Sequence, residues 1–433
     1  MDYSDRFERE LAPLRRKLSL EEEIVMVSQA GDDLRTIGKE LEDICRQQDT
    51  ADAMNDVIRV GGRVEQASPM DLFMVETSLR LATAGSSTDA YKITPSLESY
   101  VGKRMSLESF GSFISRIWEA IMAGLKKVWE AATSFFHNLF GSIPSMRRAI
   151  KTLKEDVQKL SADYRIARTG KVGGEGRSLV VNGRLPKTGR DLLSAVDVLS
   201  QHVEFYMGEF IRNAESVYRN VANEMKTFDN NDIKKSLNAM TDEALKIALM
   251  QSPKELALKQ TNDDEFSGVQ YYSLSPLLGN KTFYVHIPDE NVMKDHSNPI
   301  ERAEEVQRCV PVVRDSRDSI TSFEGEISEI DPRDMVQMCS LMLRMCDLAE
   351  EFYEGKSVKA IALTKNELMS TSGDMVERCK EIGNESPNLP YYKAGIKYNT
   401  YLTSSLLTPV TQLASSMMAS NRALLIVLQK AIA

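Results

Sequence analysis

The side chains best able to do chemistry are spread thinly along this sequence. The glycine-rich stretch 170–176 contains Lys171, but no apolar strand precedes it, and its spacing matches neither a phosphate-binding P-loop nor a dinucleotide-binding fingerprint. We interpret this stretch as a flexible loop. Pairs of adjacent acidic residues, such as Glu350 and Glu351, are typical of solvated helix ends and indicate no acid–base dyad.

The cysteines and histidines form no metal-binding or nucleophilic pattern. Cys339 and Cys346 are seven residues apart and therefore share a face of a predicted helix, where Met and Leu neighbours favour buried structural thiols. We predict that the protein is not an enzyme and has no catalytic, cofactor-binding or metal-binding residues. The histidines, each isolated from the others and from any closely spaced cysteine pair, are His137, His202, His286 and His296.

Length and composition are those of a soluble globular protein. The chain has 433 residues, of which 42% are apolar and 27% charged, which allows several domains and a substantial core. No apolar run is long enough to span a bilayer, and the charged N-terminal residues lack the apolar core of a secretory signal. Five scattered cysteines favour a reducing compartment over a disulfide framework.

Charge is arranged in sequential blocks. Residues 1–98 carry 12 Lys and Arg against 20 Asp and Glu, whereas residues 109–190 carry 15 against 6. The chain from Asp191 onward is acidic again. Blocks of opposite sign suggest segments with separate roles, because one domain usually mixes its charges. The alternative is that helix surfaces simply vary in charge and the blocks are accidental.

The elements that must position these residues are mostly helices, and the most distinctive helix is predicted over residues 110–140. Apolar and aromatic residues recur there at steps of three and four, which is the helical period, and polar residues lie mainly opposite. Such a stripe is buried in a bundle or contacts a membrane interface or partner. Its face consists of Phe110, Phe113, Ile117, Trp118, Ile121, Leu125, Trp129, Phe136 and Phe140.

The remaining pattern predicts a mainly α fold, a multi-helix bundle with a small antiparallel β element. The β element is expected at about residues 178–185, around a type I′ Asn182-Gly183 turn, and at 269–288. We divide the chain into an acidic helical region, 1–98, an amphipathic aromatic helix with a basic helix, 99–168, and a helical domain with small hairpins, 169–433. Further helices are expected at about 145–168, 188–227, 229–250, 300–309, 331–354, 357–382 and 392–430.

The tripeptide Ser-Leu-Glu occurs at Ser19, Ser96 and Ser106, which is more often than composition predicts. The last two copies continue as Ser-Leu-Glu-Ser and lie at or after a predicted linker, residues 82–96, where an extended segment can enter a protease cleft. The copy at Ser106 also fits the N-cap and acidic first turn of helix 110–140. The copy at Ser96 has no such structural role.

These small-x-Glu sequences, followed by a helix of the form Phe-x-x-x-Ile-x-x-x-Trp with Lys-Lys-Val-Trp-Glu, resemble the internal head proteins of phiKZ-like giant tailed bacteriophages. The later stretch 278–288 is similar to a glycine-turn-strand element of those proteins. In that family a prohead protease removes an N-terminal propeptide by cutting after Ser/Ala-x-Glu. The resemblance therefore implies cuts at Glu98–Ser99 and Glu108–Ser109, with Glu21–Glu22 as a further candidate.

The resemblance implies a virion structural protein, made in the host cytoplasm and packaged inside the capsid, with ejection alongside DNA as a later fate. Its implied partners are the prohead protease, capsid or other internal head proteins, and DNA phosphates contacted nonspecifically by the basic segment 116–190. Two other functions fit the same residues. One is a membrane-active effector whose helix 110–140 contacts the membrane interface, and the other is a cytosolic helical scaffold that buries this stripe in its core.

Overall fold

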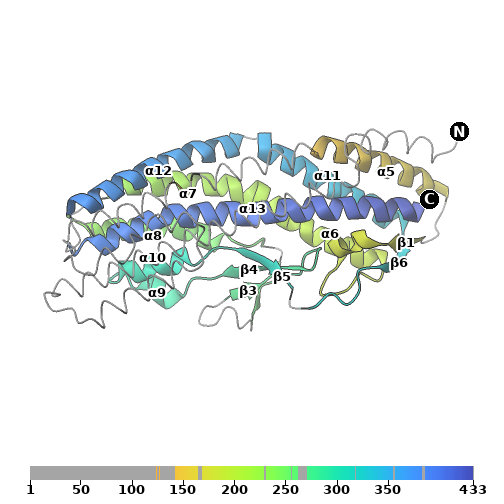
Figure 1. The fold of residues 1–433 in the computed structure, drawn as a ribbon, viewed down its shortest axis with the longest axis horizontal. Coiled ribbons are helices and arrows are strands. Elements are labelled where there is room, and N and C mark those ends of the chain that lie inside the picture. Colours follow the sequence, from red (N-terminus) through yellow and green to blue (C-terminus); the bar gives the residue numbers. More distant parts are fainter. Residues whose placement is uncertain are drawn as a thin grey trace, which may run out of the picture.

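The computed structural model describes an elongated bundle of helices, with short strands along one side (Figure 1). The long helices run side by side along the body. The residues that the structure describes are 142–163, 168–228, 231–254, 256–261, 271–316, 318–354, 356–382 and 386–432, together with Ala123 and Lys126.

The predicted mainly α fold is confirmed, and each predicted helix that falls on described residues is found within a few residues of its predicted position, whereas η3 and α9 were not predicted. In chain order they are α5 (Ile143–Asp163), the 3-10 helix η3 (Gly174–Leu179), α6 (Gly189–Glu204), the π-helical segment η4 (Phe205–Phe210), α7 (Ile211–Lys226), α8 (Ile233–Leu249), α9 (Glu290–Lys294), α10 (Pro299–Gln307), α11 (Pro332–Glu354), α12 (Lys356–Ile382) and α13 (Leu389–Ile432).

Local sequence signals fix the helix starts. Thr188 and Asp191 form a reciprocal capping box at the start of α6, because each side chain accepts a hydrogen bond from the other residue's backbone N–H at 3.1 Å. Pro299 occupies the first turn of α10, where a backbone N–H has no partner within the helix. These two signals set where α6 and α10 enter the bundle.

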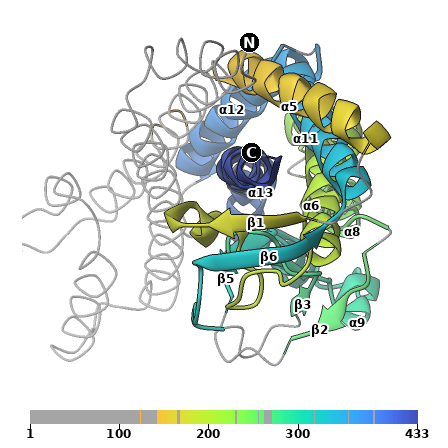
Figure 2. The same cartoon turned by 90° about the vertical axis from the view of Figure 1, so that its right-hand side faces the viewer.

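Helix α13 is the spine of the bundle. It has 44 residues and is apolar or small on almost every side, unlike the amphipathic helices around it. Viewed along the body, α13 lies at the centre, with α5, α11, α6, α12 and β1 (Arg168–Val172) around it (Figure 2). Some of its buried hydroxyl groups bond within the helix, as when Thr411 Oγ1 donates to the Leu407 carbonyl at 2.6 Å, and others bond to neighbouring elements, as when Ser420 Oγ donates to the Ser178 carbonyl at 3.1 Å.

Two further rods flank α13, and each changes its packing partner about halfway along. One rod is α6, η4 and α7, and the other is α11 followed by α12 (Figure 1). Helix α6 packs against α11, which also carries α5, whereas α7 packs against α12 and α8. The body therefore has one half built on α5, α6 and α11 and another built on α7, α8, α10 and α12, with α13 running through both.

The predicted strands at 269–288 are confirmed. They are β3 (Tyr271–Ser273) and β4 (Lys281–His286), the central pair of an antiparallel sheet ordered β2-β3-β4-β5, in which Tyr272 pairs with Val285. The outer strands are β2 (Lys259–Gln260) and β5 (Val312–Asp315).

The predicted type I′ turn is also confirmed, because Asn182 and Gly183 have φ angles of 49° and 77°. The hairpin around this turn is shorter than predicted. Val181 and Arg184 form a single bridge, and the preceding residues up to Leu179 belong to η3 instead of a strand.

The interpretation of residues 170–176 as a flexible loop is wrong. This stretch forms the end of β1 and the start of η3, and β1 pairs with β6 (Gly325–Ile330), more than 150 residues away. The glycines allow close packing: a Cβ on Gly170 would meet Val427 Cγ1 of α13 at 2.8 Å, and one on Gly176 would overlap the Phe323 carbonyl. A local pattern cannot reveal so distant a partner strand.

Candidate functional site

The site residues predicted from the sequence lie outside the residues that the structure describes. This holds for the processing junctions at Glu98–Ser99 and Glu108–Ser109 and for the aromatic face of helix 110–140. Those assignments stay predictions. The described body contains three other features that bear on function: a turn that joins several elements, a polar groove on α10, and part of the basic segment.

The turn lies in the stretch 278–288, which carried part of the family resemblance. Asn280 sits there with a φ of 58°, a left-handed conformation that asparagine tolerates, and it is buried. Its Oδ1 accepts a hydrogen bond from Gly183 N at 2.8 Å, and its Nδ2 donates to the Asp318 carbonyl at 3.0 Å. Its backbone groups bond to Val180 and Ser316. One asparagine therefore joins the 181–184 turn, the start of β4 and the segment after β5.

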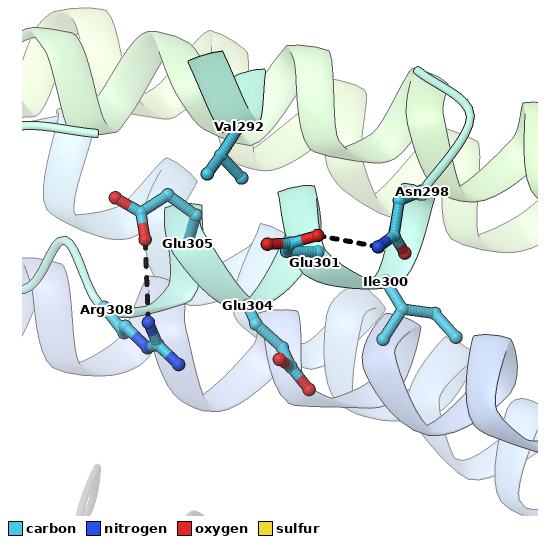
Figure 3. Close-up of a pocket in the computed structure, with 7 residues that line it drawn as sticks. All are labelled: Val292, Asn298, Ile300, Glu301, Glu304, Glu305 and Arg308. Carbon is cyan, nitrogen blue, oxygen red and sulfur yellow. Dashed lines mark hydrogen bonds and ion pairs between the residues drawn. The ribbon is translucent and has the colours of Figure 1, made fainter. Parts of the chain in front are cut away.

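The groove lies along α10 and has a volume of about 470 Å³ (Figure 3). Glu301, an exposed residue, accepts a hydrogen bond from Asn298 Nδ2 at 2.7 Å, and Glu304 is also exposed. Arg308 lies 3.7 Å from Glu305 across the groove. The groove is lined by Val292, Asn298, Ile300, Glu301, Glu304, Glu305 and Arg308.

Glu305 is the buried carboxylate of this groove, and one of its oxygen atoms, Oε1, has partners from outside α10. Its Oε1 lies 3.0 Å from His286 Nε2 at the end of β4 and accepts a hydrogen bond from Asp289 N at 2.9 Å. These contacts hold α10 against the sheet. Sequence analysis missed the pair because nineteen residues separate the histidine from the glutamate and no motif links them.

Arg302 fastens α10 to a different neighbour. Its side chain is 2% exposed, and its guanidinium donates to the Met293 carbonyl at 2.9 Å, to Asp242 Oδ1 at 2.6 Å and to Asn238 Oδ1. Asn238 and Asp242 belong to α8, so the arginine ties α10 to α8. The polar groups of α10 thus connect elements of the fold, and their arrangement indicates no reaction centre.

Some cations in the described part of the basic segment have acidic neighbours in space. In α5, Arg147 forms ion pairs with Asp347 and Glu350 of α11. In β1, Lys171 is paired in register with Glu326 of β6. Exposed cations on this part of the body include Lys151, Lys187 and Arg190. In the described residues, the block of positive charge seen in the sequence therefore contains both paired and exposed cations.

The described cysteines and histidines occupy structural positions. Cys339 and Cys346 are buried in α11, as predicted, and burial raises the pKa of each thiol to about 12. His202 is fully buried at the end of α6 beside Phe283, with ring centroids 5.3 Å apart. Burial lowers its pKa to about 4, although its Nδ1 contacts the Val198 carbonyl at 2.8 Å.

A search of the described residues for three or more His, Cys, Asp or Glu side chains placed to hold a metal ion gives none. None of the described helices is both long and apolar enough to cross a membrane.

The fold and these contacts define a mainly α-helical protein whose described polar clusters join structural elements. Residues 27–432 match the phiKZ-like phage internal head proteins, and the chain belongs to that family. No curated protein and no solved structure gives a match. Family membership confirms the resemblance seen in the sequence and makes the protein a structural component of the virion, located inside the capsid. Such a role favours a non-enzymatic protein that associates with other head components.

Proposed function

We propose that this internal head protein matures by a proteolytic cut between Glu98 and Ser99, with Glu108–Ser109 as the alternative junction. The observation that carries the proposal is the repeated Ser-Leu-Glu-Ser at the point where the acidic block 1–98 ends, in a chain of this family. Both junctions lie upstream of α5, so a cut at either one leaves every described element in the mature protein. The cut would also discard most of the excess negative charge.

N-terminal sequencing of the protein from purified virions tests this proposal. We expect a chain that begins at Ser99 or Ser109, and a chain that begins at Met1 would overturn it. Glu98→Gln and Glu108→Gln, made singly and together in the phage, identify the junction, because the protease is proposed to recognise the glutamate before the cut. Glu76→Gln, a glutamate that is not part of a Ser-x-Glu sequence, is the matched control and should leave processing unchanged.

The mature chain is further proposed to contact packaged DNA weakly through exposed cations of the segment 116–190. Lys151, Lys187 and Arg190 support a few phosphate contacts, whereas the acidic neighbours of α5 and β1 argue against strong binding. The logarithm of the DNA-binding constant falls linearly with the logarithm of the salt concentration, and replacing these three cations by glutamine should make this slope less steep by up to about 3. Lys294→Gln on α9, an exposed lysine outside this segment, should leave the slope unchanged. Binding that does not depend on salt would contradict the proposal.

Helix 110–140 is proposed to be the assembly element of the mature protein, with contact to the host membrane interface as the second candidate. The supporting observation is its aromatic face, with lysines beside it. Co-sedimentation with liposomes separates the two. If the double variant Trp118→Ala and Trp129→Ala binds liposomes as well as the natural chain does, the membrane role is lost. If the natural chain binds no liposomes but the variant fails to enter virions, the assembly role is supported.

A further inference from the structure

All three long rods of the body carry an irregularity near one level along its length: two are interrupted, and the third, α13, is continuous but contains a proline. The first interruption is η4, a π-helical segment of six residues between α6 and α7. A π segment widens the helix locally and breaks its regular hydrogen-bond ladder. The second is the junction between α11, which ends at Glu354, and α12, which begins at Lys356. The third irregularity is Pro409, where α13 stays one continuous helix but has no N–H to donate to the Ser405 carbonyl.

Contacts between the rods show that these irregularities lie together. Glu204, just before η4, pairs with Arg344, and Lys226 pairs with Glu367, so the first two rods run in the same direction with a constant offset. At 1.5 Å per residue, this offset places the end of α11 about 6 Å beyond η4.

The third rod, α13, is antiparallel to the other two and crosses the same level. Tyr218 Oη donates to the Leu402 carbonyl, which places Pro409 of α13 opposite the start of α7. The three irregularities therefore fall within about 15 Å along the axis. Elsewhere along the rods, the described helices run without such breaks.

Strand β4 bridges the same level. Its start is fixed to the α6 half, because Asn280 bonds to Gly183 and Val180. Its end is fixed to the α8 half, because His286 contacts Glu305 of α10 and Arg302 of α10 bonds to α8. Between these attachments Phe283 packs against Tyr206 of η4, with ring centroids 5.1 Å apart.

We propose that the body bends at this level, with the two halves turning relative to each other about β4. A helix with every backbone hydrogen bond in place would resist bending at this level. A π segment, a helix junction and a proline inside a helix each allow the direction of the helix axis to change at a small cost in free energy. Each half has its own set of packed helices, so the body can bend without separating the helices within either half. The sheet limits the motion on its side because β4 is attached to both halves. This inference does not depend on proteolytic processing or on DNA contact.

Distances between spin labels in the full chain test the hinge. Labels attached to unnatural ketone side chains leave the buried cysteines in place. A pair at Lys151 of α5 and Asp374 of α12 crosses the level, whereas a pair at Arg148 and Arg190 stays in one half and a pair at Lys234 and Asp374 stays in the other; all five positions are exposed. We expect the crossing distance to have a distribution at least twice as wide as either control distance.

Pro409→Ala restores the missing N–H and should narrow the crossing distribution while leaving both controls unchanged. A crossing distribution as narrow as the controls in the natural chain would overturn the proposal, and this comparison does not require the variant to fold. A wide crossing distribution that Pro409→Ala leaves unchanged would overturn the assignment of the hinge to this level.

Discussion

Asn280 illustrates how single polar residues organise this protein. The sequence predicts a turn near Gly279, and the structure adds that Asn280 combines a left-handed backbone with two side-chain hydrogen bonds to separate segments. Few residues can replace it, because the position needs tolerance of positive φ together with a donor and an acceptor. Its importance follows from its partners, which sequence spacing does not identify.

Asn280→Asp should therefore destabilise the protein by about 2 kcal/mol. The substitution keeps the acceptor for Gly183 but replaces the amide donor by a carboxylate oxygen that faces the Asp318 carbonyl. Urea unfolding measures the change. Asn182→Asp is the matched control, since Asn182 also has a positive φ but is exposed, and it should change stability by less than about 0.5 kcal/mol. Equal effects of the two variants would contradict this account.

His202 should make stability depend on pH. Its pKa is about 4 in the folded protein and close to 6.5 when unfolded, so neither state binds a proton here above pH 6.5. As the pH falls from 6.5 to 4, the unfolded state takes up the proton first. The free energy of unfolding therefore falls by about 3 kcal/mol over this range and does not fall further below it. His202→Phe should remove this part of the pH dependence, measured as unfolding free energy at each pH.

His296→Gln, a change at an exposed histidine, provides the comparison for His202 and should leave the pH dependence in place. Identical pH profiles for the natural chain and His202→Phe would show that the buried ring does not resist protonation. Because the prediction concerns the slope with pH, a constant offset in stability from the larger phenylalanine ring does not affect it.

At the scale of elements, the helices were predictable and the strands only partly so. Apolar periodicity locates α6 and α11 from sequence alone, because each helix carries its own signal within a few turns. The pairing of β1 with β6 joins segments that are distant in sequence, and the glycines of residues 170–176 give a loop-like local pattern. The same limit hides the His286–Glu305 and Arg302–Asp242 contacts, which depend on how elements pack.

Arg302 links two elements, and its loss should be costly. Arg302→Met should destabilise the protein by about 3 kcal/mol, because it leaves Asn238 and the Met293 carbonyl without their buried donor. Arg308→Met, on the same helix, removes an exposed arginine and should cost less than about 1 kcal/mol. Thermal unfolding of both variants gives the comparison. A similar loss for both would mean that the buried position of Arg302 contributes nothing extra.

At the scale of the whole molecule, α13 determines whether the bundle exists. Helices of both halves pack against it, and most of its residues are buried. A chain that ends at Ser386 should therefore lose cooperative unfolding, although it keeps every other described helix in its sequence. Circular dichroism during heating measures this. A sharp thermal transition in the shortened chain would show that the surrounding helices form a stable core without α13.

The position of α13 also has a consequence for how the protein is made. Among the described elements, the helix at the centre of the body is the one that a ribosome synthesises last. The helices that surround it leave the ribosome earlier, with the apolar faces that will contact α13 still uncovered. Folding of the body must therefore wait until α13 has left the ribosome, and growing chains pass through an interval in which their uncovered apolar faces are prone to aggregate or to bind chaperones.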